Sequence, residues 1–264
     1  MYITDSHCHL YYEPYINNLG EMIKESKFNN VNSFLSISVD LETSIKNIEI
    51  SQKYKEIFCT IGLHPNNVYK SAKNLDKIFN LYNLNSKILG IGEAGIDLFK
   101  SRNNLNDQII YFQKQIEFSI QNKLPLIIHS RDAEIETLNI LKRYANQNLN
   151  FILHCFSGSE YFAMECLNLN GYISFGGIIT FKNSINLTKI CKKLPMDRIL
   201  VETDSPYLSP HPYRGKVNHP KNTLLVVKKI AQIKNKTINE ISRETTNNFN
   251  RLFKLNDKIK KISL

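Results

Sequence analysis

Near the start of the chain the sequence reads Tyr2-Ile3-Thr4 and then Asp5-Ser6-His7-Cys8-His9, a short apolar run that leads into two alternating histidines. In an extended strand, residues two apart point to the same side, so His7 and His9 would project together into one space. Two imidazoles that converge in this way can bind a divalent metal ion. Such a pair can also be ordinary polar sequence at a strand end, so its meaning depends on partners elsewhere in the chain.

The same unit, an apolar run followed by polar residues, recurs along the chain and alternates with longer segments of helical period. The apolar runs predict strands at residues 2–4, 34–39, 57–61, 88–91, 124–128, 151–153, 172–175 and 199–201. Apolar residues spaced three and four apart predict helices, among them 108–122, 134–144, 224–233 and 238–253. Strands rich in Ile, Val and Leu that alternate with helices are typical of a parallel sheet buried on both faces.

Eight strand–helix units in about 250 residues favour a closed TIM (β/α)8 barrel. An open, doubly wound sheet usually carries a glycine-rich phosphate-binding turn after its first strand, and this chain has none there. We therefore predict a single α/β barrel domain over residues 1–255, followed by a tail at 256–264. The helix at 238–253 is additional to the barrel, and Thr237 with Glu240 has the spacing of a capping box at its start.

The composition indicates which environment and partners the protein suits. Of its 264 residues, 42% are hydrophobic, and its five cysteines form no Cys-X-X-Cys pair, which is typical of free thiols in a reducing compartment. The sequence shows no secretion signal and no apolar run of about 18 residues. We expect a cytoplasmic, monomeric protein without a membrane partner. The net charge of +10 would suit nucleic acid, although a surface rich in Lys, as an AT-rich genome would encode, has the same charge.

The barrel prediction allows a test, because the active sites of such folds lie at the carboxyl ends of the strands. Histidines and carboxylates do follow most of the predicted strands. The residues that we expect to bind metal at this rim are His7, His9, Glu93, His129, His154 and Asp204. His64 follows the third predicted strand, whereas His211 and His219 lie in the loop after the eighth. Independent histidines without a common role would not keep occurring at strand ends.

Six nitrogen and oxygen ligands are too many for one tetrahedral zinc with an open position. They suit two divalent metal ions bridged by Glu93, which lies across the barrel between the His7/His9 pair and the pair on the fifth and sixth strands. Asp204 would complete the shell of the first ion and take the proton of an activated water, so we assign catalytic roles to Asp204 and Glu93. Imidazole and carboxylate ligands leave the choice among Zn, Mn and Mg open.

Six motifs along the chain together resemble the TatD family of metal-dependent deoxyribonucleases. They are Asp5-Ser6-His7-Cys8-His9-Leu10, Gly62-Leu63-His64-Pro65, Gly92-Glu93-Ala94-Gly95-Ile96-Asp97, His129-Ser130-Arg131-Asp132-Ala133, His154-Cys155-Phe156-Ser157-Gly158 and Glu202-Thr203-Asp204-Ser205-Pro206-Tyr207-Leu208. The resemblance implies an amidohydrolase-type TIM barrel with two divalent cations, and the matching ligand positions are those already named. It also implies a phosphodiesterase that acts on DNA as its substrate, often as a 3′–5′ exonuclease.

The substrate contacts are less clear than the metal ligands. Arg131 and Arg214 are placed to reach a phosphodiester through a planar guanidinium, although Arg214 could instead hold its own loop. His64 could contact the scissile group or a base. Tyr207 could stack on a base or pack in the interior.

Two other functions compete with the nuclease. A small-molecule amidohydrolase or lactonase could use the same barrel, but many such enzymes bridge their metals with a modified lysine where this chain offers Glu93. A structural zinc protein is disfavoured because structural sites are closed four-ligand cages. DNA, RNA and nucleotide fragments remain alternatives as the substrate.

Overall fold

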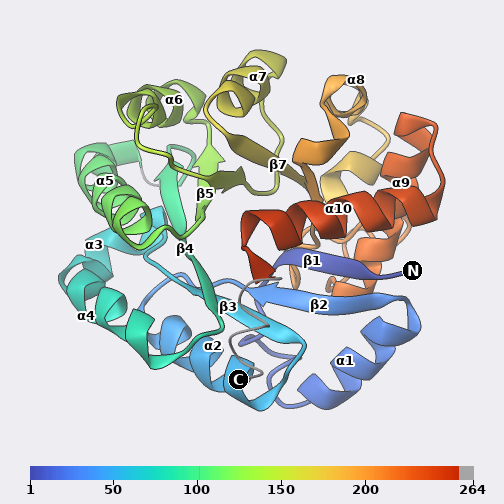
Figure 1. Ribbon diagram of the computed structural model, residues 1–264, viewed down its shortest axis with the longest axis horizontal. Helices are drawn as coiled ribbons and strands as arrows, with labels where there is room; N and C mark the ends of the chain where they lie inside the picture. The colour runs from blue at the N-terminus through green and yellow to red at the C-terminus, as the bar shows by residue number, and fades with distance from the viewer. Residues whose placement is uncertain (101, 256–264) are drawn as a thin grey trace.

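The computed structural model describes residues 1–100 and 102–255 of the chain (Figure 1). The predicted tail at 256–264 lies outside the described residues. The strands pair in parallel and in sequence order within one sheet. They are β1 (Ile3–Cys8), β2 (Val31–Ser36), β3 (Ile57–Ile61), β4 (Ile88–Asp97), β5 (Leu126–Arg131), β6 (Phe151–Leu153), β7 (Gly171–Phe175) and β8 (Ile199–Val201).

The sheet closes on itself between its first and last strands. A parallel bridge joins Cys8 to Ser205, and the amide of His9 donates to the carbonyl of Ser205 at 2.8 Å. The amide of Asp204 donates to the carbonyl of His7 at 2.9 Å. The predicted TIM barrel is therefore confirmed, and its closure brings the histidine pair beside the carboxylate that follows β8.

Helices surround the barrel, as Figure 1 shows. Their bounds are α1 (Leu19–Phe28), α2 (Leu41–Lys53), α3 (Val68–Ser71), α4 (Leu75–Asn80), α5 (Leu105–Asn122), α6 (Glu134–Arg143), α7 (Glu160–Asn168), α8 (Ile185–Lys193), α9 (Thr223–Lys234) and α10 (Ile238–Leu252). The four helices predicted by residue range are confirmed as α5, α6, α9 and α10, with ends that shift by at most three residues. Among the described residues, no helix is both long and apolar enough to cross a membrane.

Three strands extend further at their carboxyl ends than their apolar runs predicted, and one of them, β5, continues to Arg131. β1 continues to Cys8 and β4 to Asp97, because the polar residues at their ends remain extended and paired with neighbouring strands. In contrast, β2 ends at Ser36 and not at the predicted residue 39. The consequence for the site is that His7 and Glu93 lie within strands, where the sheet holds their backbones.

The additional helix α10 seals one end of the barrel. Its start has the predicted capping box, in which Thr237 and Glu240 bond each other's backbone amides. The α10 side chains of Ser242 and Thr246 donate to the carbonyl of Tyr2, just before β1. Apolar residues at the end of the helix pack on the inward-facing residues of the strands, in one cluster of Leu35, Ile37, Leu89, Ile127, Ile152, Tyr172, Leu200, Phe249, Leu252, Phe253 and Leu255. α10 thus covers the amino ends of the strands and leaves the carboxyl ends for the site.

Candidate metal centre

The two histidines at the end of β1 lie side by side, as their spacing predicted. The Nε2 atoms of His7 and His9 are 3.4 Å apart, and both side chains are buried. The Oδ1 atom of Asp204 is 3.6 Å from Nε2 of His7 and 3.3 Å from Nε2 of His9. Barrel closure therefore assembles a histidine–histidine–carboxylate group from the two ends of the sheet, within the distance range of a common metal ion.

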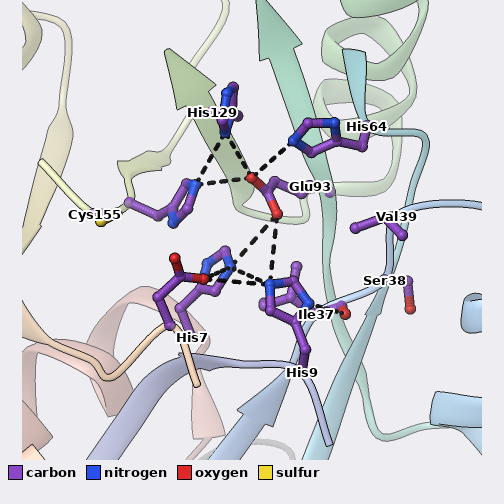
Figure 2. A network of polar contacts seen from close by, with 12 residues as sticks. His7, His9, Ile37, Ser38, Val39, His64, Glu93, His129 and Cys155 are labelled. Atoms are coloured by element: carbon purple, nitrogen blue, oxygen red, sulfur yellow. Dashed lines mark hydrogen bonds and ion pairs between the residues drawn. The ribbon is translucent and has the colours of Figure 1, made fainter. Parts of the chain in front are cut away.

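Glu93 lies at the centre of the cluster, and its two oxygens face different histidines (Figure 2). Its Oε2 atom is 3.6 Å from Nε2 of His7 and 3.9 Å from Nε2 of His9. Its Oε1 atom is 2.8 Å from Nδ1 of His129 and 2.8 Å from Nε2 of His154. One carboxylate thus connects a group at the carboxyl ends of β1 and β8 with a group at the carboxyl ends of β5 and β6.

Glycines around Glu93 allow the strands to approach closely enough for this arrangement. A Cβ atom on Gly62 would lie 2.5 Å from the backbone of Gly92, and one on Gly95 would lie 2.0 Å from the carbonyl oxygen of His129. Gly95 also has φ +145°, which side-chain-bearing residues rarely adopt. The Glu93 amide donates to the carbonyl of Ser38 at 2.7 Å. Neighbouring strands therefore fix the position of the central carboxylate.

Outer partners orient three of the histidines. The Nε2 atom of His129 is 3.2 Å from Asp97, which leaves Nδ1 for the centre. Glu202 is 3.5 Å from Nδ1 of His154, and the carbonyl of Ile37 is 3.1 Å from Nδ1 of His9, which leaves Nε2 of both rings for the centre. Acceptors on the far ring nitrogen are the usual way in which proteins set the tautomer of a metal-binding histidine.

His64 differs from the other histidines of the cluster. Its Nδ1 atom accepts a hydrogen bond from the backbone amide of Asn66 at 3.0 Å. Burial lowers the pKa of His64, against the opposing effect of Glu93, so the ring is neutral near pH 7. A neutral ring that accepts at Nδ1 carries its proton on Nε2, which lies 3.3 Å from Oε1 of Glu93. His64 is therefore arranged as a hydrogen-bond donor.

The charges of the cluster compensate one another. Burial opposes ionisation of Glu93, but the surrounding histidines hold the pKa of its carboxyl well below the ordinary value. Burial likewise opposes protonation of His154, while Glu93 and Glu202 raise its pKa well above the ordinary value. Protons on the imidazoles thus balance the carboxylates, and a cation that binds here must displace those protons.

The donor set fits divalent cations. Imidazole nitrogens converge in two pairs, His7 with His9 and His129 with His154, and the second pair is separated by 3.5 Å. Each pair also faces one oxygen of Glu93. Imidazoles with carboxylates are ligands that Zn and Mn accept, and Mg accepts the carboxylates.

Comparison with known proteins also indicates a metal-binding protein. The profile of the family described as TatD related DNase matches residues 4–254, which is nearly the whole chain. The chain belongs to the TatD family. The combination of this match with the buried histidine–carboxylate cluster makes it a metal-dependent hydrolase.

Relatives of this TatD protein match it from end to end. YabD of Bacillus subtilis, named a metal-dependent hydrolase, is 38% identical over 255 residues, which cover 96% of this chain and 100% of YabD. YcfH of Escherichia coli bears the same description and is 32% identical, with 96% of each chain covered. The crystal structure of the E. coli TatD homologue YjjV has the same fold, with a TM-score of 0.91, 24% identity and coverage of 96% of this chain and 98% of that one.

The two arginines predicted to bind substrate lie in different surroundings in this TatD protein. Arg131 ends β5, and its guanidinium lies over the ring of Phe99, 3.8 Å from the centroid. It also lines a pocket of about 200 Å³ together with His154 and Phe156. Arg214 lies over the ring of Phe181 at 4.5 Å, and none of the contacts found in the described part of the chain joins it to the histidine cluster. Arg131 therefore lies beside the centre, and the role of Arg214 in substrate binding stays a prediction.

The loop histidines of this TatD protein lie apart from the cluster. His219 accepts from the amide of Lys221 and is 3.4 Å from Glu25, so it holds the loop before α9. Asp97 and Glu202, the outer partners of His129 and His154, were not predicted as site residues. Asp97 is four residues from Glu93 on β4, and this even spacing was the signal that could have placed the two carboxylates on one side of the strand. Glu202 is two residues from Asp204, but both lie after the end of β8, so the strand rule does not place them.

Proposed function

We propose that this TatD protein hydrolyses phosphodiester bonds of DNA with two divalent cations. His7, His9 and Asp204 would hold one cation with Oε2 of Glu93. His129 and His154 would hold the other with Oε1 of Glu93. The observation that carries the proposal is the division of the two Glu93 oxygens between these groups, because a carboxylate shared in this way can hold two cations side by side, as a two-metal hydrolase does.

Bound divalent cations supply Lewis-acid stabilisation of phosphate oxygens and lower the pKa of a water molecule. The side chains of this protein carry out the remaining tasks. Asp204 accepts the proton of the attacking water. Burial opposes its ionisation, but the hydrogen bond with His9 and the nearby histidines hold the pKa of its carboxyl below the ordinary value. Asp204 is therefore an ionised base at neutral pH.

His64 and Arg131 are placed to act on the phosphate. The Nε2 proton of His64 points to the centre, where it can donate to a phosphoryl oxygen as negative charge develops. The guanidinium of Arg131 is exposed at the rim beside His154 and can pair with a phosphate of the substrate. The net charge of +10 favours association with a polyanion. The family description, TatD related DNase, supports DNA as that polyanion, and we propose cleavage from its 3′ end.

The test is product mapping on end-labelled single-stranded DNA with Zn, Mn or Mg. We expect stepwise shortening from the 3′ end, which chelator abolishes and Glu93→Gln reduces by a factor of at least about 1,000, because the variant loses the charge shared by both cation groups. Glu42→Gln is the matched control, because the Glu42 side chain is exposed and pairs only with Lys46 among the described residues.

RNA, an amide and a lactone are assayed in parallel. Faster turnover of the amide or lactone than of any phosphodiester would contradict the proposal and favour a small-molecule hydrolase. DNA cleavage that persists in chelator would also contradict it.

A further inference from the structure

Two exposed tyrosines stand beside the metal centre. Tyr12 is 37% exposed and Tyr207 is 49% exposed, although both rings contact buried residues. Their centroids are 6.0 Å apart with an interplanar angle of 78°, so the two rings meet edge to face and form a corner. The ring of His9 is 6.1 Å from Tyr12 and 6.0 Å from Tyr207. The corner therefore lies directly against a histidine of the cluster.

The backbone holds both tyrosines to the same turns that carry the cluster. The amide of Tyr207 donates to the carbonyl of Asp204 at 2.9 Å, and the side-chain amide of Asn218 donates to the carbonyl of Tyr207 at 2.7 Å. The carbonyl of Tyr12 accepts the amide of Tyr15 at 2.9 Å, so a turn fixes this residue three positions after His9. The rings are thus preorganised and need little ordering when a ligand binds.

Tyr11 shows what a purely structural tyrosine at this place looks like. It is 6% exposed, and its hydroxyl lies 3.3 Å from Nδ1 of His9. Its ring packs on Tyr12 with centroids 4.5 Å apart. Tyr11 therefore packs against His9 and Tyr12 on their buried side, while the rings of Tyr12 and Tyr207 remain partly exposed to solvent.

We propose that Tyr12 and Tyr207 form a stacking site for one nucleobase next to the cleaved phosphodiester. The inference rests on the proposed function, in which the phosphate binds at the centre that includes His9 and Asp204. A base one sugar away from that phosphate reaches the corner, where it stacks on one ring and meets the edge of the other. Every base has a flat apolar face, so such a site accepts all four bases.

The site selects for unpaired nucleic acid. A base within a duplex already stacks on its neighbours and cannot enter the corner without leaving them. A base at a frayed end or in a single strand carries a smaller unstacking cost.

The test compares oligonucleotides that differ in one base. Single-stranded DNA is prepared intact, or with an abasic tetrahydrofuran unit at the last or the next-to-last position of the cleaved end. For the wild-type protein, one of the two abasic substrates should show a KM roughly tenfold higher than the intact strand. Tyr12→Leu and Tyr207→Leu should remove this difference, whereas Tyr12→Phe and Tyr207→Phe should keep it. Phe28→Leu, at an 89% exposed ring on the end of α1, is the control and should behave as wild type.

Stacking is also measured without catalysis. 2-Aminopurine at the same position of the oligonucleotide loses fluorescence when it stacks, so its titration with protein in chelator reports the site directly. We expect quenching by the wild-type protein and by both Phe variants, and weaker quenching by both Leu variants.

The outcomes separate the two proposals. Cleavage of all three oligonucleotides with one KM, or an abasic difference that survives both Leu variants, overturns the stacking site and leaves the phosphodiesterase intact. The absence of cleavage of every oligonucleotide with any of the three metals overturns both.

Discussion

Glu202 provides a sharp test of how the metal centre is oriented. It is fully buried, its Oε1 accepts the amide of Cys155 at 2.7 Å, and the same oxygen is 3.5 Å from Nδ1 of His154. Glu202→Gln preserves the size of the side chain and an acceptor for the amide. It removes the negative charge that favours a proton on Nδ1 of His154, and with it the preference for a free Nε2 toward the centre.

The magnitude follows from the place of Glu202 behind a metal-binding histidine. Loss of such an outer partner lowers metal affinity by about 10- to 100-fold, which corresponds to about 1.4–2.7 kcal/mol of binding free energy. Glu202→Ala has a further cost, because it leaves the buried amide of Cys155 without an acceptor. We expect that loss to lower the free energy of unfolding by about 1–3 kcal/mol.

The assay is calorimetric titration of chelator-treated protein with Zn at pH 7. We expect Glu202→Gln to keep the stoichiometry and to weaken one of the two binding events, with thermal stability of the metal-free protein nearly unchanged. Glu160→Gln is the matched control, because Glu160 lies on the surface of α7 and pairs with Lys193. Unchanged affinity for both ions in Glu202→Gln would refute the orienting role of this carboxylate.

Three further predictions follow from other residues of the site. Gly95→Ala should lower the free energy of unfolding, measured in urea, by more than about 3 kcal/mol, because the added Cβ would lie 2.0 Å from the carbonyl oxygen of His129. Gly20→Ala is the control and should change this free energy by less than about 1 kcal/mol, because the space around Gly20 is open. Equal effects of the two variants would contradict the packing argument. Burial raises the pKa of Asp5 to about 7, so the folded protein keeps a proton on this carboxyl that the unfolded chain releases above about pH 4. The metal-free wild-type protein should therefore lose stability relative to Asp5→Asn as the pH rises from about 4 to about 7. A gain in stability relative to Asp5→Asn over this range would contradict the prediction. His64→Gln should lower kcat about 100-fold and keep both metal equivalents, so loss of one equivalent would show that His64 is a ligand.

The clustering of the histidines and carboxylates was predictable from the sequence, because in a barrel the position of a residue along the chain determines its position in space. Each of His7, Glu93 and His129 follows an apolar run, and a closed parallel barrel brings the carboxyl ends of all strands to one rim. The even spacing of His7 and His9 then fixed their common side. Local patterns and one topological rule were sufficient to bring these side chains together.

Other features depend on contacts that no local pattern encodes. Arg214 lies over Phe181 because the long loop after β8 folds back on the segment after β7, and the sequence left open whether this arginine would reach a phosphate. The tautomer of His64 is set by the amide of Asn66, which depends on a single backbone turn. The sequence allowed Tyr207 either to stack on a base or to pack in the interior, and its 49% exposure excludes packing in the interior.

The bridge between Cys8 and Ser205 joins segments that are synthesised far apart in time. The first histidine pair leaves the ribosome long before the carboxylate that faces it, and α10, which seals the opposite end of the barrel, follows later still. A prematurely terminated chain lacks both the full ligand set and the plug of its interior. A chain that ends before Asp204 therefore has neither the closing bridge nor the carboxylate of the cluster.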